Sequence, residues 1–218
     1  MSRNPDSLIT DELYQSYLGF LLSGDRPSCT GVVETLLDRG IALKSLYADL
    51  FQKSLYEVGK LWESNRISVA REHLATAITE GLMSVVYPKL FEGSRDIGKA
   101  VISCSVNEYH QIGGKMVSDI FEMNGWQGYF LGSNTPQEEL ISFVDEVDPD
   151  LLGLSLSVYF NYPALERCIE AVRSEFVGLD ILVGGQAFSW GGTDSLGKFS
   201  SVEYVSSLDE LEKQIRKE

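Results

Sequence analysis

The sequence predicts an α/β protein in which an N-terminal four-helix bundle precedes a five-stranded parallel sheet with flanking helices. Two observations support this division. Apolar residues recur at helical spacing through about the first 93 residues, whereas short apolar runs alternate with helical segments after residue 98. The charge also shifts, with 10 basic and 13 acidic side chains in residues 1–97 but 8 and 19 in residues 98–218. We therefore expect two domains, 1–97 and 98–218.

Four helices are expected in the first domain, each between recognisable start and stop signals. Glycines favour helix ends, Ser68 is a suitable N-cap, and Pro88 stops the last helix. Trp62 is expected to close the third helix on its apolar face, and His73 to face inward on the fourth. The helices are bounded by Leu13 and Gly24, Pro27 and Gly40, Leu43 and Asn65, and Ser68 and Pro88.

The second domain follows residues 94–98, which form the expected linker. Alternation of strands and helices implies a parallel sheet covered on both faces. The expected strands are 100–105, 129–131, 151–156, 181–183 and 203–205, and the expected helices are 113–123, 137–147, 162–176 and 208–215.

Composition excludes several classes of protein. A formal charge of −14 argues against direct nucleic-acid binding, which depends on Lys and Arg. The three cysteines show no C-x-x-C pair, which is typical of a reducing compartment. No apolar run is long enough for a signal core or a membrane span, so we expect a cytoplasmic protein without membrane association.

The unusual polar and glycine residues of the second domain follow predicted strands. They are Glu108, His110 and Gly113 after the first strand, Ser155 and Ser157 at the third, and Gly184 and Gly185 after the fourth. Ligands of open parallel sheets bind beyond the carboxyl ends of the strands, so these loops are expected to form one site.

His110 is the candidate metal ligand of that site. Glu108 is close enough in sequence to bond one imidazole nitrogen and fix the tautomer. A metal site usually needs several protein ligands, so His110 could instead be an ordinary loop residue. A single ligand does suit a metal already held by a macrocycle, where only axial positions are open.

Three ordered motifs carry a family resemblance. Glu108-x-His110-x-x-Gly113, Ser155 with Ser157, and Gly184-Gly185 resemble the D/E-x-H-x-x-G, S-x-L and G-G signature of base-off cobalamin-binding domains. The resemblance implies a Rossmann-like domain in which His110 ligates cobalt from below. It also implies that the nucleotide tail of the cofactor inserts between the serine and glycine positions.

A second pattern lies in the helical domain. Trp62, nine intervening residues and then Glu72-His73 resemble the cap of cobalamin-dependent photoreceptors. That resemblance implies that these three residues line the cavity of the upper axial group. The alternative is that a tryptophan and an inward histidine on helices are core packing.

The chain departs from the photoreceptor pattern in three ways. Glu63 stands where some members have a histidine that can ligate cobalt, and Ser157 stands where the signature often has leucine. The DNA-binding module of the family is not expected in this chain. The resemblance therefore implies cobalamin binding but not promoter repression.

The sequence as a whole favours a non-enzymatic, light-responsive cobalamin sensor. It would bind adenosylcobalamin, methylcobalamin or hydroxocobalamin, and it would regulate a protein partner such as a DNA-binding transcription factor, with homo-oligomerisation as a further option. One alternative is the corrinoid methyl carrier of a methyltransferase system. Another is a haem or other tetrapyrrole sensor.

Overall fold

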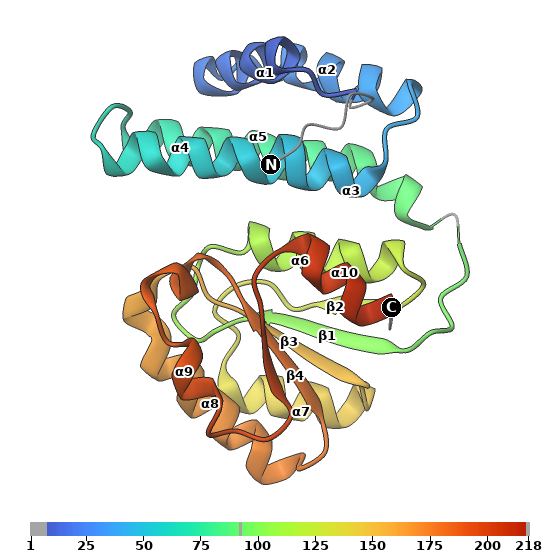
Figure 1. Ribbon diagram of the computed structural model, residues 1–218, viewed down its shortest axis with the longest axis vertical. Coiled ribbons are helices and arrows are strands. Elements are labelled where there is room, and N and C mark those ends of the chain that lie inside the picture. Colours follow the sequence, from blue (N-terminus) through green and yellow to red (C-terminus); the bar gives the residue numbers. More distant parts are fainter. Residues whose placement is uncertain (1–7, 92, 217–218) are drawn as a thin grey trace. The chain divides into compact units, whose positions relative to one another are not determined.

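A computed structural model describes residues 8–91 and 93–216 of the chain, and its residues group into two compact units (Figure 1). The first unit spans Met1–Lys89, and the elements described in it are helices; the second, Leu90–Glu218, contains the sheet. Within the described residues, no helix is long and apolar enough to cross a membrane. The helical N-terminal region and the α/β class are as predicted.

Two of the expected signals, Gly24 and Ser68, lie at helix ends in the helical unit, and Thr10 is a cap that was not predicted. The Thr10 side chain caps the first helix, Ser68 caps the last by accepting from the Arg71 N–H, and Gly24 ends the first helix in the left-handed conformation. The elements are α1 (Asp11–Ser23), α2 (Arg26–Asp38), α3 (Leu43–Ser45), η1 (Leu46–Gln52), α4 (Lys53–Glu63), α5 (Val69–Val86) and η2 (Tyr87–Phe91).

The third predicted helix contains a π-helical stretch, η1, which the sequence pattern did not predict. The wider turn buries two adjacent pairs, Leu46 with Tyr47 and Leu50 with Phe51. Beyond it, α4 buries Val58 and Leu61. Trp62 lies about 100° further round the helix than Leu61 and is exposed, so its expected place on the apolar face is wrong.

The expectation that His73 faces inward is also wrong, because its side chain is 75% exposed. Apolar residues surround much of α5, so the sequence offers more than one possible buried row. Packing selected the row that contains Ala75, Ile78 and Leu82. His73 precedes Ala75 by two positions, which places it on nearly the opposite side of the helix.

The sheet has five parallel strands in the order β2-β1-β3-β4-β5. The register pairs Cys104 with Ser155 and Ser155 with Gly184, so the carboxyl ends of three strands lie in one row. The strands are β1 (Lys99–Cys104), β2 (Gln127–Phe130), β3 (Leu151–Ser155), β4 (Asp180–Gly184) and β5 (Val202–Val205). The number of strands and their parallel direction confirm the prediction.

Helices cover both faces of this sheet. Figure 1 shows α6 and α10 on one face and α7 and α8 on the other. An apolar core on the α7 and α8 side includes Leu152, Leu165 and Ile181. The helical elements are α6 (Ile112–Met123), α7 (Gln137–Val147), η3 (Tyr159–Asn161), α8 (Tyr162–Glu175), η4 (Gln186–Trp190), α9 (Thr193–Leu196) and α10 (Leu208–Arg216).

Gly185 has a structural role at the end of β4. Its φ is +117°, and a Cβ placed there would lie 2.2 Å from the Leu156 carbonyl oxygen. The backbone after β4 therefore passes too close to the backbone after β3 for any side chain.

We expect Gly185→Ala to destabilise the ligand-free α/β unit by at least about 2 kcal/mol, because it combines backbone strain with a steric clash. Urea unfolding followed by circular dichroism measures this change. Gly178→Ala is the matched control, since a Cβ at Gly178 meets nothing within 4 Å. Equal stability of the two variants would contradict the close approach.

Candidate functional site

The candidate site lies at the carboxyl ends of β1 and β3. The chain leaves β1 toward α6 on one face of the sheet and leaves β3 toward α8 on the other (Figure 1). Such a switch in direction opens the crevice where ligands of doubly wound sheets bind. Glu108 and His110 lie in the loop after β1, and Ser157 lies in the loop after β3.

Glu108 joins these two loops through its carboxylate, which is completely buried. Oε1 accepts from the backbone N–H of His110 at 2.9 Å and lies 2.6 Å from Nδ1 of the same residue. Oε2 accepts from the backbone N–H groups of Ser157 and Val158 at 2.8 and 2.9 Å. One buried charge is therefore held by four nitrogen partners from two loops.

The environment of Glu108 favours its ionised form. Burial is the largest effect and by itself raises the pKa, but the hydrogen bonds from the His110 ring and from the backbone N–H groups of His110, Val158 and Ser157 outweigh it. The pKa of Glu108 is accordingly lowered from its usual value. A carboxylate that stays charged can hold the imidazole in a fixed orientation.

His110 combines a fixed ring with an accessible face. Its side chain is 58% exposed although Glu108 is buried beside it. Because Nδ1 lies against Glu108, the nitrogen suited to a metal is Nε2. A carboxylate that orients the outer nitrogen of a ligating histidine is the usual arrangement in metal sites, so this pair fits the role of a single axial ligand.

Three asparagines that the sequence analysis did not single out fix the loop. The Asn107 N–H donates to Asn134 Oδ1, and the Asn134 N–H donates to the Glu108 carbonyl. Asn161 donates from its side chain to the Asn107 carbonyl. Asn107 and Asn134 both have positive φ, which asparagine tolerates better than most residues. Their residue type was the available signal.

The predicted serine and glycine positions lie on the same edge. Ser155 is buried, and its Oγ lies 3.9 Å from the place of a Cβ on Gly113. Ser157 contributes its backbone N–H to Glu108. Gly184 is paired with Ser155 in the sheet, and Gly185 accommodates the neighbouring backbone. The structure thus brings these residues to the ends of β3 and β4 and to the start of α6.

The other three predicted site residues, Trp62, Glu72 and His73, belong to the helical unit. Glu72 and His73 form a pair, with Oε2 2.5 Å from Nδ1, and Thr76 donates to the other carboxylate oxygen at 3.0 Å. Trp62 is exposed at the end of α4. Since both Trp62 and His73 are exposed, the alternative that they serve as core packing is wrong.

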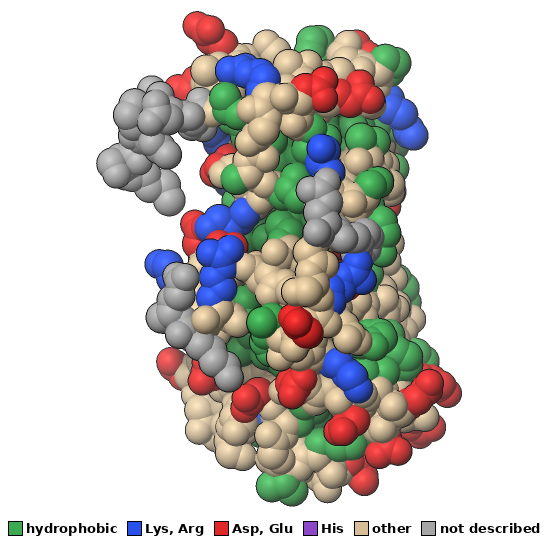
Figure 2. Space-filling model, turned by 90° about the vertical axis from the view of Figure 1, so that its right-hand side faces the viewer, with side chains coloured by type: hydrophobic (Ala, Val, Ile, Leu, Met, Phe, Trp, Pro, Cys, Tyr) green, Lys and Arg blue, Asp and Glu red, His purple; other side chains and the backbone are tan. Residues whose placement is uncertain are grey.

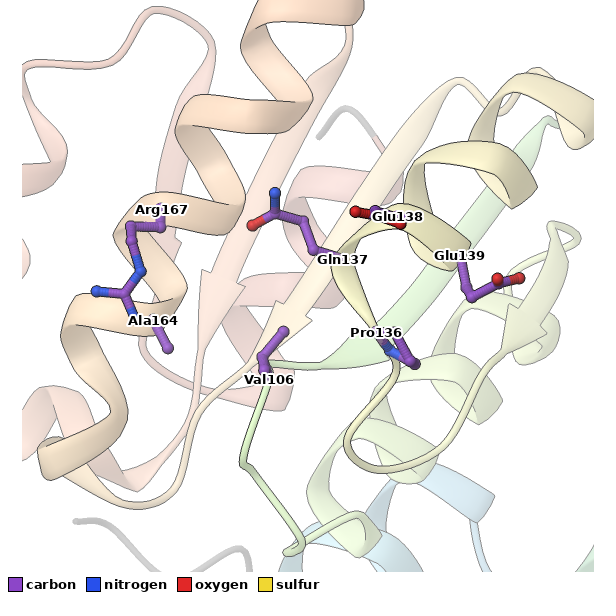
Figure 3. A pocket seen from close by; sticks show the side chains of 7 residues that line it. All are labelled: Val106, Pro136, Gln137, Glu138, Glu139, Ala164 and Arg167. Atoms are coloured by element: carbon purple, nitrogen blue, oxygen red, sulfur yellow. The ribbon is translucent and has the colours of Figure 1, made fainter.

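A separate pocket of about 440 Å³ lies between the start of α7 and α8 (Figure 3). None of the predicted site residues lines it. Figure 3 shows Ala164 and Arg167 on α8 and Val106 in the loop after β1. The remaining lining residues are Pro136, Gln137, Glu138 and Glu139.

Comparison with known families matches both units. Two models, each described as a B12 binding domain, match residues 13–87 and 98–202. The chain belongs to the B12-binding domain family. The matched regions cover the helical unit from α1 to the start of η2 and the sheet as far as the start of β5. Cobalamin is therefore the cofactor class of this protein.

Relatives of this B12-binding protein include two kinds of protein. It is 27% identical to the HTH-type transcriptional repressor CarH of Myxococcus xanthus over 79% of this chain, which spans 57% of that repressor. It is 22% identical to dimethylamine corrinoid protein 1 of Methanosarcina acetivorans, over 90% of this chain and 93% of that protein. The relatives thus comprise a regulator and a corrinoid protein.

A solved structure supports the fold of both units. The monomethylamine corrinoid protein of Methanosarcina barkeri has a TM-score of 0.82 against this chain at 15% identity. The match covers 94% of this chain and 98% of that one. The corrinoid protein fold, including the Rossmann-like sheet, is therefore confirmed.

We expect Glu108→Gln to lower the stability of the ligand-free α/β unit by about 2 kcal/mol at pH 7, because an amide cannot accept from all four nitrogens. The folded-state pKa of Glu108 is below its unfolded value, near 4.5. Its ionised form therefore contributes stability above that pH, and the contribution is lost as the pH falls through the folded-state pKa. Urea unfolding at a series of pH values measures the difference.

Glu146→Gln provides the control, since Glu146 is exposed on α7 and its replacement is expected to change stability by less than about 0.5 kcal/mol. A stability difference between wild type and Glu108→Gln that stays constant from pH 7 to below the folded-state pKa would exclude this role for the carboxylate.

Proposed function

We propose that this cobalamin-binding chain is a light-responsive sensor that regulates a partner protein through a conformational or oligomeric change. The observation that carries cobalamin ligation is the Glu108–His110 pair at the β1/β3 switch point. His110 would hold cobalt through Nε2, and Glu108 would orient the ring. Gly113, Ser155, Ser157, Gly184 and Gly185 would surround the nucleotide tail.

The observation that favours a sensor is the composition of the exposed surface of the helical unit. Trp62 and the Glu72–His73 pair take no part in the core of that unit, so intramolecular packing does not explain them. An exposed tryptophan with an oriented imidazole suits contact with the face of a metal-bearing macrocycle. We assign these three residues to the cavity of the upper axial group.

Bound adenosylcobalamin or methylcobalamin supplies a cobalt–carbon bond that light can break. The residues of the chain would sense whether the upper group is present. Loss of the upper group would change the contacts available to Trp62 and His73, and a partner that binds the two states unequally would convert this change into a signal.

The partner proposed is a protein, such as a DNA-binding transcription factor, and the chain itself would be non-catalytic. Acidic side chains are spread over the α/β unit on the face drawn in Figure 2, which disfavours direct contact with nucleic acid. The relative CarH is named as a transcriptional repressor, and this chain spans 57% of its length.

A second candidate is a corrinoid methyl carrier of a methyltransferase system. Coverage of 93% of dimethylamine corrinoid protein 1 favours it. A carrier would exchange methyl groups with a methyltransferase in darkness, whereas a sensor would change state only on illumination. Comparing methyl exchange in the dark with the light response separates the two.

We expect His110→Ala to weaken methylcobalamin binding by at least about ten-fold and to abolish the absorption bands of histidine-ligated cobalt, because the axial ligand is lost. Titration in darkness, followed by absorption spectroscopy, measures both effects. His73→Ala should retain those bands in darkness. Unchanged spectra and affinity in His110→Ala would remove the assignment of the metal ligand.

We expect Trp62→Ala to alter the response to light while leaving lower ligation by His110 intact. Illumination of the adenosylcobalamin complex should change its absorption spectrum and its elution from a sizing column in the wild type, and this change should be reduced or lost in the variant. Tyr56→Ala, at another exposed aromatic residue of α4, is the control. Identical light responses in wild type and Trp62→Ala would contradict the role of the tryptophan.

A further inference from the structure

Exposed apolar side chains gather in the loops that follow β1, β3 and β4. Phe160 is 89% exposed and Trp190 is 76% exposed, which is unusual for side chains of this size. The same loops also expose Tyr109, Val158 and Tyr159. All five residues lie at the end of the sheet that carries His110, and none of them belongs to the sequence motifs of the site.

These loops are tied to the His110 loop by specific contacts. Glu108 binds His110 with one carboxylate oxygen and the backbone of Ser157 and Val158 with the other. The Asn161 side chain, one residue beyond Phe160, donates to the Asn107 carbonyl at 3.0 Å. The start of the Phe160 segment is therefore held beside the candidate metal ligand.

The Trp190 segment is held against the Phe160 segment in turn. A Cβ on Gly191, the residue after Trp190, would lie 3.9 Å from the Tyr159 hydroxyl. The Tyr162 hydroxyl donates to the Gly192 carbonyl at 2.7 Å, and its ring stacks on Tyr159 with centroids 5.8 Å apart. Fixed backbones thus present Phe160 and Trp190 to the outside.

We propose that Phe160 and Trp190 form an apolar wall against the corrin ring of the bound cofactor, on the side from which His110 reaches the metal. The inference rests on the proposed ligation by His110. A macrocycle held through Nε2 would be much wider than the imidazole and would reach the segments beside His110. The Phe160 segment is fastened to Glu108, and the Trp190 segment is fastened to the Phe160 segment. Exposed aromatic side chains on an ordered backbone favour binding when they lose contact with water against the apolar face of a ring.

The first test uses cobinamide, the corrin without its nucleotide, so that contacts with the ring are separated from contacts with the tail. Phe160→Ala and Trp190→Ala should each weaken cobinamide and cobalamin binding by the same factor, about ten-fold. Val177→Ala is the control. Val177 is 77% exposed, but it precedes β4 and so lies at the amino ends of the strands, at the other end of the sheet from His110. Its affinity should match that of the wild type.

The second test reports contact directly. Hydroxyl-radical labelling in darkness, read out by mass spectrometry, should show several-fold slower modification of Phe160 and Trp190 when cobinamide is bound and no change at Val177. These residues are exposed in the described structure, so their labelling without ligand provides the baseline.

The outcomes separate this inference from the proposed function. Wild-type protein that binds neither corrinoid would refute the cobalamin site itself. Wild-type binding with variant affinities within about two-fold, and with Phe160 and Trp190 still labelled, would overturn the wall and leave the cobalamin site standing. Variants that bind cobalamin more weakly but bind cobinamide as the wild type does would also overturn the wall, because the contact would then be with the nucleotide tail.

Discussion

The buried carboxylate of Glu108 is the interaction on which the site depends. A charge removed from water is costly unless hydrogen bonds replace its hydration, and four nitrogen atoms supply them here. Three of these are backbone groups, so the carboxylate fixes the path of two loops as well as one side chain. The β1 and β3 loops are thereby held together at the point where the sheet opens to a ligand.

Both histidines pair with a neighbouring glutamate, but the two pairs differ in burial. Each has Nδ1 against a neighbouring carboxylate oxygen, at 2.6 Å in His110 and 2.5 Å in His73. Glu108 is completely buried and has a lowered pKa, whereas the Glu72 side chain is 22% exposed and that of His73 is 75% exposed. A buried partner fixed by three backbone N–H groups holds the His110 ring in one orientation, which suits a permanent ligand. The more accessible pair suits a group that responds to a change.

Much of the fold followed from local patterns. The first and last helices of the bundle and all five strands were predictable because caps, glycines and buried runs determine them residue by residue. The π-helical η1 and the exposed faces of Trp62 and His73 were not predictable. Apolar residues surround α5, and only the packing of neighbouring helices decides which row is buried.

The sequence by itself determined the family signature, the number of strands, the approximate positions of most helices and strands, and the candidate ligand His110, since these depend on residue type and spacing. Tertiary structure alone decided the strand order, the burial of Glu108 and its bonds to Ser157 and Val158, residues some 50 positions away. It also revealed that Gly185 makes room for the Leu156 backbone. The reason is that strand neighbours and loop contacts are set by long-range packing, which no local pattern encodes.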